Sequence, residues 1–373
     1  MKVLIKIFNI VIFPFTLVLG LLLVVSGQSP SLSPLVSPYL PLLGLSFPIL
    51  YFINIVLFIY WIVQIKWKAL IPSAFLFLNL GQASLYFQWN EKYEFPPTNA
   101  DKLKVITYNA NLFGHFSDQW NLDSVVSVIK TENADITCLQ EVYSKESSLE
   151  KLFLTLKKTC NYRYGVVYKL TNKRQYGMVM LSKFPILEWE KINFKDTTGN
   201  MAMQVDIELS SPNNFPEMSE VVRLYNIHLQ SFRFNKDDYK TIEKARSTNQ
   251  IDEKNTKGLI DRITLAYNKR TKQVDILNDR MKSCELPRIV LGDFNDVPVS
   301  YAYRQLSKSL NDAFLERGIG LETTYKGPFP SFRIDYILHS EQFECVQYNS
   351  RENVPGDHKL ISAEFNLSPL LQK

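Results

Sequence analysis

The segment Arg288–Asn295, with the sequence RIVLGDFN, is the stretch from which the fold of this chain is best read. Residues 288–291 form a short apolar run with β-branched residues, which predicts a buried strand ending at Gly292. Asp293 and Asn295 follow directly. Polar side chains at the end of a rigid strand are well placed to act as catalytic groups. Taken alone, however, Gly292-Asp293 is equally typical of an ordinary turn.

Polar side chains occupy similar positions at five other predicted strands. They are Asn109 after residues 104–108, Glu141 after 136–139, His228 at the end of 221–228, Asp335 within 333–338, and Asp357 with His358 before 360–365. Each is compatible with a structural role when considered singly, such as a surface carboxylate or a satisfied histidine. Together they form a set of carboxylates, amides and imidazoles distributed over strand ends.

The remaining periodicity predicts many strands and few helices. Residues 122–131 and 260–281 carry apolar side chains at helical spacing, whereas most other apolar runs are short or alternate. This pattern predicts an α+β fold in which two mainly antiparallel sheets pack together with helices outside.

The combined set of side chains favours metal-assisted attack of water on phosphorus. Carboxylate and amide oxygens suit a hard ion such as Mg²⁺, with Mn²⁺ as an alternative. A phosphodiester is anionic, so its hydrolysis needs a cation and hydrogen-bond donors to neutralise developing charge. A histidine paired with a carboxylate can take up the proton of the attacking water.

Six short motifs in one order carry a resemblance to a known family. They are Val105-Ile-Thr-Tyr-Asn109, Leu139-Gln-Glu141, Asn226-Ile-His228, Gly292-Asp-Phe-Asn295, Arg333-Ile-Asp-Tyr336 and Gly356-Asp-His358. In this order they resemble the endonuclease/exonuclease/phosphatase (DNase I-like) superfamily over residues 102–367. The resemblance implies a four-layer α/β/β/α sandwich and hydrolysis of phosphate esters.

The resemblance also implies a metal centre. Glu141 is its expected principal ligand, with Asn109 and Asn111 beside it and Asp357 nearby. Two departures from the usual pattern, Gly356 before Asp-His and Tyr108 in the first motif, do not touch an expected ligand.

Five further residues receive catalytic roles from the same resemblance. Asp293 is expected to orient or deprotonate the nucleophilic water or to assist the leaving group, and Asn295 to hold a phosphate oxygen. His228 is expected to donate a hydrogen bond to the phosphate. His358, oriented by Asp335, is expected to act as general base or phosphate donor. Which of Asp293 and His358 takes the proton stays open at this point.

The first 90 residues have the composition of a membrane region, because residues 7–65 contain no charged side chain. Apolar runs predict three transmembrane helices at about residues 7–25, 42–63 and 69–87. A cleaved signal peptide is the alternative for the first run. A buried or interfacial helix is the alternative for the third, which contains Asn79 and Gln82.

The basic residues predict the orientation of these helices. Lys2, Lys6, Lys66 and Lys68 flank one side, whereas the Ser/Pro-rich loop 27–41 carries no charge. With three spans the positive-inside rule predicts a multi-pass membrane protein whose catalytic domain lies outside the cytoplasm. With two spans that domain would be cytoplasmic. Residues 91–101, with two prolines, are predicted to form a stiff linker.

The composition narrows the range of partners only slightly. The formal net charge of +5 permits an anionic partner. It is modest for a dedicated nucleic-acid binder, which usually has a denser basic face. The four cysteines show no CxxC or Cys/His spacing. Nucleic acid, phospholipid and small phosphodiesters are all candidate substrates, and no protein partner is inferred. A sphingomyelinase-type lipid phosphodiesterase and a non-catalytic membrane adaptor are the alternatives.

Overall fold

The computed structural model describes residues 2–64, 66–90, 102–114, 121–145, 147–171, 174–194, 199–211, 215–248, 253–327, 331–367 and 370. The predicted linker 91–101 lies outside the described residues. The chain divides into two compact units. The first, here called the membrane unit, comprises Met1–Phe87, Arg233–Thr271 and Asp296–Gln305. The second, here called the sandwich unit, comprises Gln88–Phe232, Lys272–Asn295 and Leu306–Lys373.

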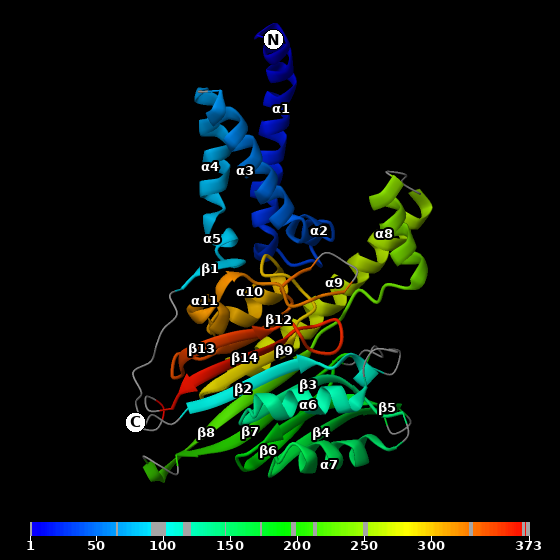
Figure 1. Ribbon diagram of the computed structural model, residues 1–373, viewed down its shortest axis with the longest axis vertical. Helices are drawn as coiled ribbons and strands as arrows, with labels where there is room; N and C mark the ends of the chain where they lie inside the picture. Colours follow the sequence, from blue (N-terminus) through cyan, green and yellow to red (C-terminus); the bar gives the residue numbers. More distant parts are fainter. Residues whose placement is uncertain are drawn as a thin grey trace. The chain divides into compact units, whose positions relative to one another are not determined.

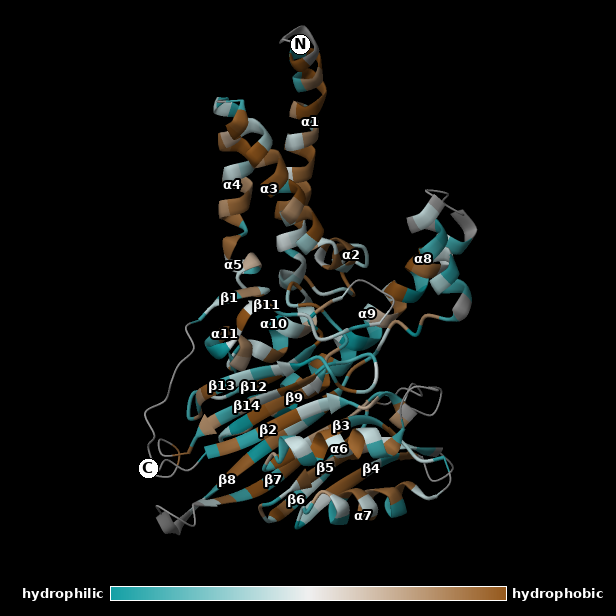
Figure 2. Ribbon diagram, in the orientation of Figure 1, coloured by the Kyte–Doolittle hydropathy of each residue, from teal (hydrophilic) through white to brown (hydrophobic). Residues whose placement is uncertain are grey.

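The N-terminal part of the membrane unit is helical and strongly apolar (Figures 1 and 2). Its elements are α1 (Lys2–Gly27), η1 (Ser29–Ser31), α2 (Leu40–Leu45), α3 (Phe47–Val63), η2 (Trp67–Ala69), α4 (Leu70–Leu78) and α5 (Leu80–Ala83). Among the described residues, one helix is long and apolar enough to cross a bilayer, whereas 47–63 and 67–78 are apolar but shorter. A membrane anchor is therefore possible, and the predicted second and third spans are each interrupted.

Both interruptions have local causes. Ser46 separates α2 from α3, and its hydroxyl donates to the carbonyl of Leu42 at 3.0 Å. Pro48 then lies in the first turn of α3, where its missing N–H is tolerated. Asn79 separates α4 from α5, because its side chain donates to the carbonyl of Phe75 at 2.9 Å and competes with the helical pattern.

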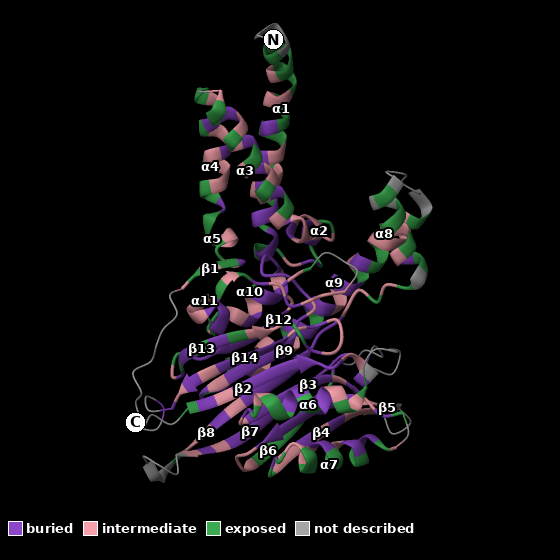
Figure 3. Ribbon diagram, in the orientation of Figure 1, coloured by how far each residue is buried: buried purple, intermediate pink, exposed green. Residues whose placement is uncertain are grey.

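The apolar N-terminal helices pack through small and polar residues. A Cβ atom added to Gly20 of α1 would lie 1.9 Å from the ring of Phe75 in α4, so only glycine permits this approach. The Trp61 indole donates to Thr16 Oγ1 at 3.0 Å, and the Asn54 amide donates to the Leu19 carbonyl at 3.3 Å. Many other apolar side chains of these helices are exposed (Figure 3), as expected for a lipid-facing surface.

The rest of the membrane unit comes from segments distant in sequence. These are α8 (Lys236–Thr248), the first half of α9 (Glu253–Lys282), and a loop that leads into α10 (Tyr301–Ser307). Val299 from this loop is fully buried in a cluster with Leu23 and Phe47. Arg270 of α9 and Asp296 form a buried ion pair at 2.8 Å.

The sandwich unit contains two six-stranded sheets. The first has the order β13-β14-β2-β3-β5-β4 and the second β10-β12-β9-β8-β7-β6. The first sheet comprises β2 (Lys102–Asn109), β3 (Ile136–Tyr143), β4 (Tyr164–Thr171), β5 (Arg174–Ser182), β13 (Glu344–Arg351) and β14 (Leu360–Asn366). The second comprises β6 (Ile186–Ile192), β7 (Met201–Ser211), β8 (Phe215–His228), β9 (Arg288–Asp293), β10 (Asn311–Asp312) and β12 (Asp335–His339). The remaining short elements are β1 (Phe87–Trp89), η3 (Asn111–Gly114), α11 (Ala313–Arg317) and β11 (Ile319–Leu321).

The two sheets bury a shared core and carry helices on their outer faces (Figures 1 and 3). Inner residues such as Val105 and Cys138 of one sheet pack with Met203 and Leu224 of the other. Helices α6 (Leu122–Glu132) and α7 (Leu149–Thr159) cover the outer face of the first sheet through a second cluster. The second half of α9 also buries its apolar side chains Val274, Leu277 and Met281. The predicted α+β four-layer sandwich is confirmed.

Candidate active site

The sheet register brings the predicted catalytic residues to one region of the sandwich unit. Strands β2 and β3 form one parallel pair, and strands β8 and β9 form another. Because the two strands of a parallel pair run in the same direction, their C-terminal ends lie next to each other. In the second pair His228 lies opposite Asp293, and in the antiparallel β9–β12 pair Asp293 lies opposite Asp335. The polar residues at these ends are therefore adjacent in space although they are far apart in sequence.

Unusual backbone conformations direct these side chains. Gly292 has φ +138°, and a Cβ there would lie 2.0 Å from the carbonyl oxygen of Ile227, so this position requires glycine. Glu141 and Asn295 have φ angles of 51° and 52°, which non-glycine residues rarely adopt. Such conformations cluster at functional sites, where the surrounding structure supports them.

Asp293 is the centre of the hydrogen-bond network. It is 1% exposed, and its carboxylate accepts from the Asn109 amide at 3.0 Å and from the Asn295 amide at 3.1 Å. The backbone N–H of Asn295 also donates to it at 2.7 Å. Burial raises the pKa of Asp293 to about 6, and the charge of Asp335 acts in the same direction.

His358 and Asp335 form a buried pair beside Asp293. The His358 Nδ1 atom lies 2.9 Å from one Asp335 oxygen and 3.2 Å from the other, while Nε2 lies 3.8 Å from Asp293. Burial alone would lower the pKa of His358. The negative charges of Asp335 and Asp293 outweigh it and raise that pKa to about 10.

His228 connects Asp293 to Glu141. Its Nε2 atom lies 3.5 Å from a Glu141 oxygen and 3.9 Å from an Asp293 oxygen. Its Nδ1 atom lies 3.5 Å from the hydroxyl of Tyr176 on β5. His228 is buried, whereas the Glu141 side chain is 27% exposed and so remains accessible from solvent.

The predicted metal ligands lie within the same network and offer oxygen atoms. The Asn109 side-chain oxygen accepts from the backbone N–H of Asn111 at 3.0 Å, and the Asn111 amide donates to Asp357. Glu141 reaches the network through His228. Two carboxylates and an amide oxygen fit a hard divalent ion such as Mg²⁺.

The contacts therefore join all eight predicted site residues into one network. Their individual roles stay predictions. Sequence reasoning missed several residues that contact this network. One is Tyr325, whose ring packs edge-on against the ring of His358 with 5.4 Å between the ring centroids. Another is Thr324, whose hydroxyl accepts from the Asp335 N–H at 3.0 Å. Neither residue type carries a signal in the sequence that would mark it as part of a catalytic site.

Comparison with protein-family models gives two matches. The model of the endonuclease/exonuclease/phosphatase family matches residues 106–358. A second model, of a domain of unknown function, matches residues 6–86. No curated protein sequence matches the chain.

Solved structures share the fold at low sequence identity. A family protein from Bacteroides vulgatus is 15% identical, with a TM-score of 0.51 over 71% of this chain and 98% of that one. A conserved protein of unknown function from Enterococcus faecalis V583 is 13% identical, with a TM-score of 0.50 over 70% and 99%. A family protein from Beutenbergia cavernae is 14% identical, with a TM-score of 0.50 over 71% of both chains. At these identities the likeness concerns the fold alone.

Proposed function

Because the chain belongs to the endonuclease/exonuclease/phosphatase family, we propose that it is a membrane-anchored, metal-dependent hydrolase that cleaves phosphodiesters with water. The observation that carries this proposal is the buried network around Asp293, which the side chains of Asn109, His228 and His358 approach from separate strands or loops. A non-catalytic adaptor would have no need for a buried cluster of ionisable groups with perturbed pKa values.

Glu141, Asn109 and Asp357 are the residues that would hold the metal ion in this proposal. Bound there, Mg²⁺ or Mn²⁺ would neutralise phosphate charge and polarise the scissile P–O bond. His228 contacts both Glu141 and Asp293, so it is placed to donate to a phosphate oxygen beside them. Asn295 is fixed by its hydrogen bonds to Asp293 and can orient the same group.

The geometry favours Asp293 as the proton acceptor and His358 as a hydrogen-bond donor. The Nδ1 atom of His358 faces Asp335, and its raised pKa keeps the imidazole protonated at neutral pH. A cationic imidazole donates hydrogen bonds, so His358 stabilises the phosphoryl oxygens. Asp293 is ionised above a pKa of about 6 and is the better acceptor for the proton of the attacking water.

The activity test uses the full chain in detergent with added Mg²⁺ or Mn²⁺. DNA, RNA, inositol phosphates, sphingomyelin and a bis-aryl phosphate are offered separately. Glu141→Gln is expected to lower turnover by about 10²-fold or more, because it removes the charge that holds the ion. Glu150→Gln is the matched control, since Glu150 is a surface residue paired with Lys169. Turnover of sphingomyelin alone would select the lipid-directed alternative. No turnover by folded protein with added metal would support the adaptor and refute the proposal.

We also propose that three membrane segments place the sandwich unit outside the cytoplasm. The support is the position of Lys6, Lys66 and Lys68 on one side of the apolar runs and the uncharged loop 27–41 on the other. C-terminal fusions to a periplasmic phosphatase reporter and to a fluorescent protein test this orientation. Phosphatase activity is expected from the first. Bright fluorescence from the second, without phosphatase activity from the first, would reverse the orientation.

A further inference from the structure

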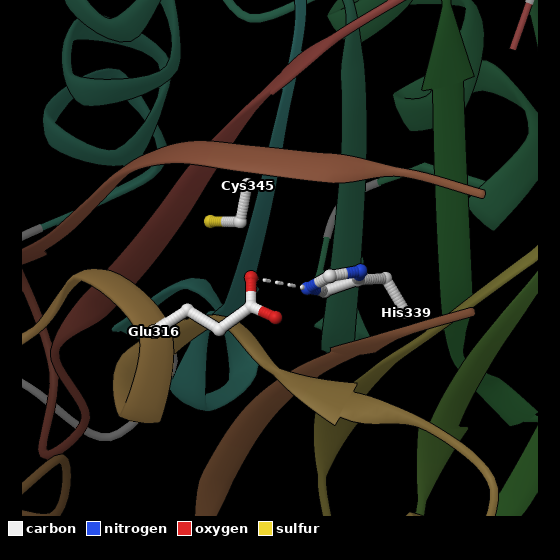
Figure 4. Close-up of side chains that lie close together, drawn as sticks. All are labelled: Glu316, His339 and Cys345. Atoms are coloured by element: carbon white, nitrogen blue, oxygen red, sulfur yellow. Dashed lines mark ion pairs between the residues drawn. The ribbon is translucent and has the colours of Figure 1, made fainter. Parts of the chain in front are cut away.

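A second group of potential ligands lies in the sandwich unit, outside the network around Asp293. It consists of Glu316 on α11, His339 on β12 and Cys345 on β13 (Figure 4). One oxygen, one nitrogen and the sulfur of these residues all lie within 4.8 Å of one another. His339 and Cys345 are 0% and 1% exposed, whereas the Glu316 side chain is 33% exposed. Three separate elements thus converge on one point that solvent can reach.

The environment of His339 leaves one ring nitrogen directed at this point. Its Nδ1 atom lies 3.1 Å from the backbone carbonyl of Ser340, an acceptor that fixes the proton on Nδ1. In the neutral ring the other nitrogen, Nε2, then carries a lone pair. Metal-bound histidines are commonly held in this way by a carbonyl that accepts from the second nitrogen.

In the neutral ring, the lone pair of His339 Nε2 faces the Glu316 carboxylate. Nε2 lies 3.2 Å from a Glu316 oxygen, yet it has no hydrogen-bond partner in this buried position. A lone pair facing a carboxylate at that distance is repulsive unless a proton or a metal ion lies between them. A shared proton would require a hydrogen-bond geometry that the pair does not have.

We propose that Glu316, His339 and Cys345 bind one divalent transition-metal ion of borderline softness, represented by Zn²⁺. Sulfur, imidazole nitrogen and carboxylate oxygen are the three ligand types that Zn²⁺ combines in proteins, with about 2.0–2.3 Å between ion and ligand. The 3.2 Å separation of nitrogen and oxygen matches two ligands of one such ion. The sulfur lies within 4.8 Å of both atoms.

Cys345 is a thiol until the ion arrives. Burial raises its pKa, and the nearby charge of Glu316 acts in the same direction. Binding therefore forms a metal–sulfur bond and releases the thiol proton to solvent. The site joins α11, β12 and β13, and β12 also carries Asp335 at its opposite end. Asp335 and His339 are four residues apart in an extended strand, about 13 Å, so the ion would be separate from the phosphoesterase metal.

Cobalt spectroscopy of the full chain in detergent tests the proposal. The protein is stripped with a chelator and titrated with Co²⁺. One equivalent is expected to produce a thiolate-to-cobalt charge-transfer band that Zn²⁺ then abolishes. The network around Asp293 contains no sulfur ligand, so the same band is expected in Glu141→Gln. Cys345→Ser is expected to lose the band, and Cys160→Ser, which alters a half-buried cysteine elsewhere, is expected to keep it.

A partly exposed ligand provides a variant that is expected to fold. Glu316→Gln should weaken Co²⁺ binding about tenfold or more and reduce the rise in melting temperature that Zn²⁺ causes in the unaltered chain. A folded, unaltered chain that gives no thiolate band and retains no zinc after dialysis would overturn the proposal. Persistence of the band in folded Cys345→Ser would do the same. In either case His339 and Glu316 would be an ordinary ion pair.

Discussion

Replacing Asp335 by asparagine is the sharpest test of how the site handles protons. The Asp335 carboxylate is 1% exposed and contacts His358 Nδ1 at 2.9 Å and 3.2 Å. Asparagine has nearly the same shape, and its side-chain oxygen can still accept from Nδ1. The backbone N–H of this position donates to Thr324, which the substitution leaves unchanged. Asp335→Asn therefore removes a charge while retaining the position of the ring.

The expected effect follows from the pKa of His358. Burial lowers this pKa, and Asp335, the largest opposing influence, helps to raise it to about 10. Without Asp335, burial opposes the remaining charges of Asp293 and Asp357, and the pKa should fall toward about 6.5, the ordinary value for histidine. At pH 8 the protonated fraction of His358 would then drop from about 0.99 to about 0.03. If the protonated imidazole is the donor, kcat at pH 8 should fall roughly thirtyfold. At pH 6 most of the imidazole would remain protonated, so the loss there should be about twofold or less.

The direction of the pH dependence distinguishes between two roles for His358, a protonated hydrogen-bond donor and a general base. A group that must be protonated supports activity below its pKa and loses it as the pH rises through that value. Asp335→Asn should therefore move the alkaline limb of the kcat profile from about pH 10 toward neutrality. If His358 were the base instead, lowering its pKa would extend activity toward acid.

The assay measures kcat for a soluble phosphodiester between pH 5.5 and 9 at saturating Mg²⁺. Asp123→Asn, an exposed aspartate at the start of α6, is the control and should leave the profile unchanged. An Asp335→Asn variant with an unshifted alkaline limb would refute the assignment of His358 as a donor held protonated by Asp335. Relative activity that increases with pH would point to His358 as the base.

Other predictions concern stability and metal dependence. Arg270→Met should lower the free energy of unfolding by about 3–5 kcal/mol, because it leaves Asp296 as an unpaired buried charge; chemical denaturation in detergent measures this. Arg280→Met, which breaks a partly exposed pair, should change it by about 1 kcal/mol or less. Gly292→Ala should destabilise the fold by at least about 2 kcal/mol because of its positive φ, whereas Gly258→Ala, in an open helical position, should stabilise it by about 0.5 kcal/mol. Chelation by EDTA should abolish hydrolysis without a change in circular dichroism, and added Mg²⁺ should restore it.

The sequence predicted the sandwich, and it marked residues that the fold brings close together, because strand ends carry a local signal. An apolar run followed by a polar pair, as in residues 288–295, marks both the strand and the point where it ends. The order of such segments then identified the sheet arrangement by resemblance. Tyr325 and Thr324 gave no such signal, because they reach His358 and Asp335 only through the folded loop that contains them.

The apolar N-terminal helices were predicted less well. Hydropathy measures average composition and does not register a single side chain that competes for backbone hydrogen bonds. Ser46 and Asn79 each donate to a carbonyl four residues earlier, at the two points where the predicted spans are interrupted. The assignment of 42–63 and 69–87 as spans therefore stays a prediction, because the helices found there, 47–63 and 67–78, are shorter, whereas the helix from Ile5 to Ser31 has sufficient length and apolarity.

The segment Asp296–Gln305 belongs to the same compact unit as the N-terminal helices. Asp296 directly follows Asn295 in the chain and is held by Arg270 in a buried ion pair. Three residues later, Val299 is fully buried against Leu23 of α1. Interiors are close-packed, so removal of α1 would leave a void beside Val299 and release the loop that it fixes. The segment 6–86 that a separate family model matches therefore folds together with a loop from far along the chain.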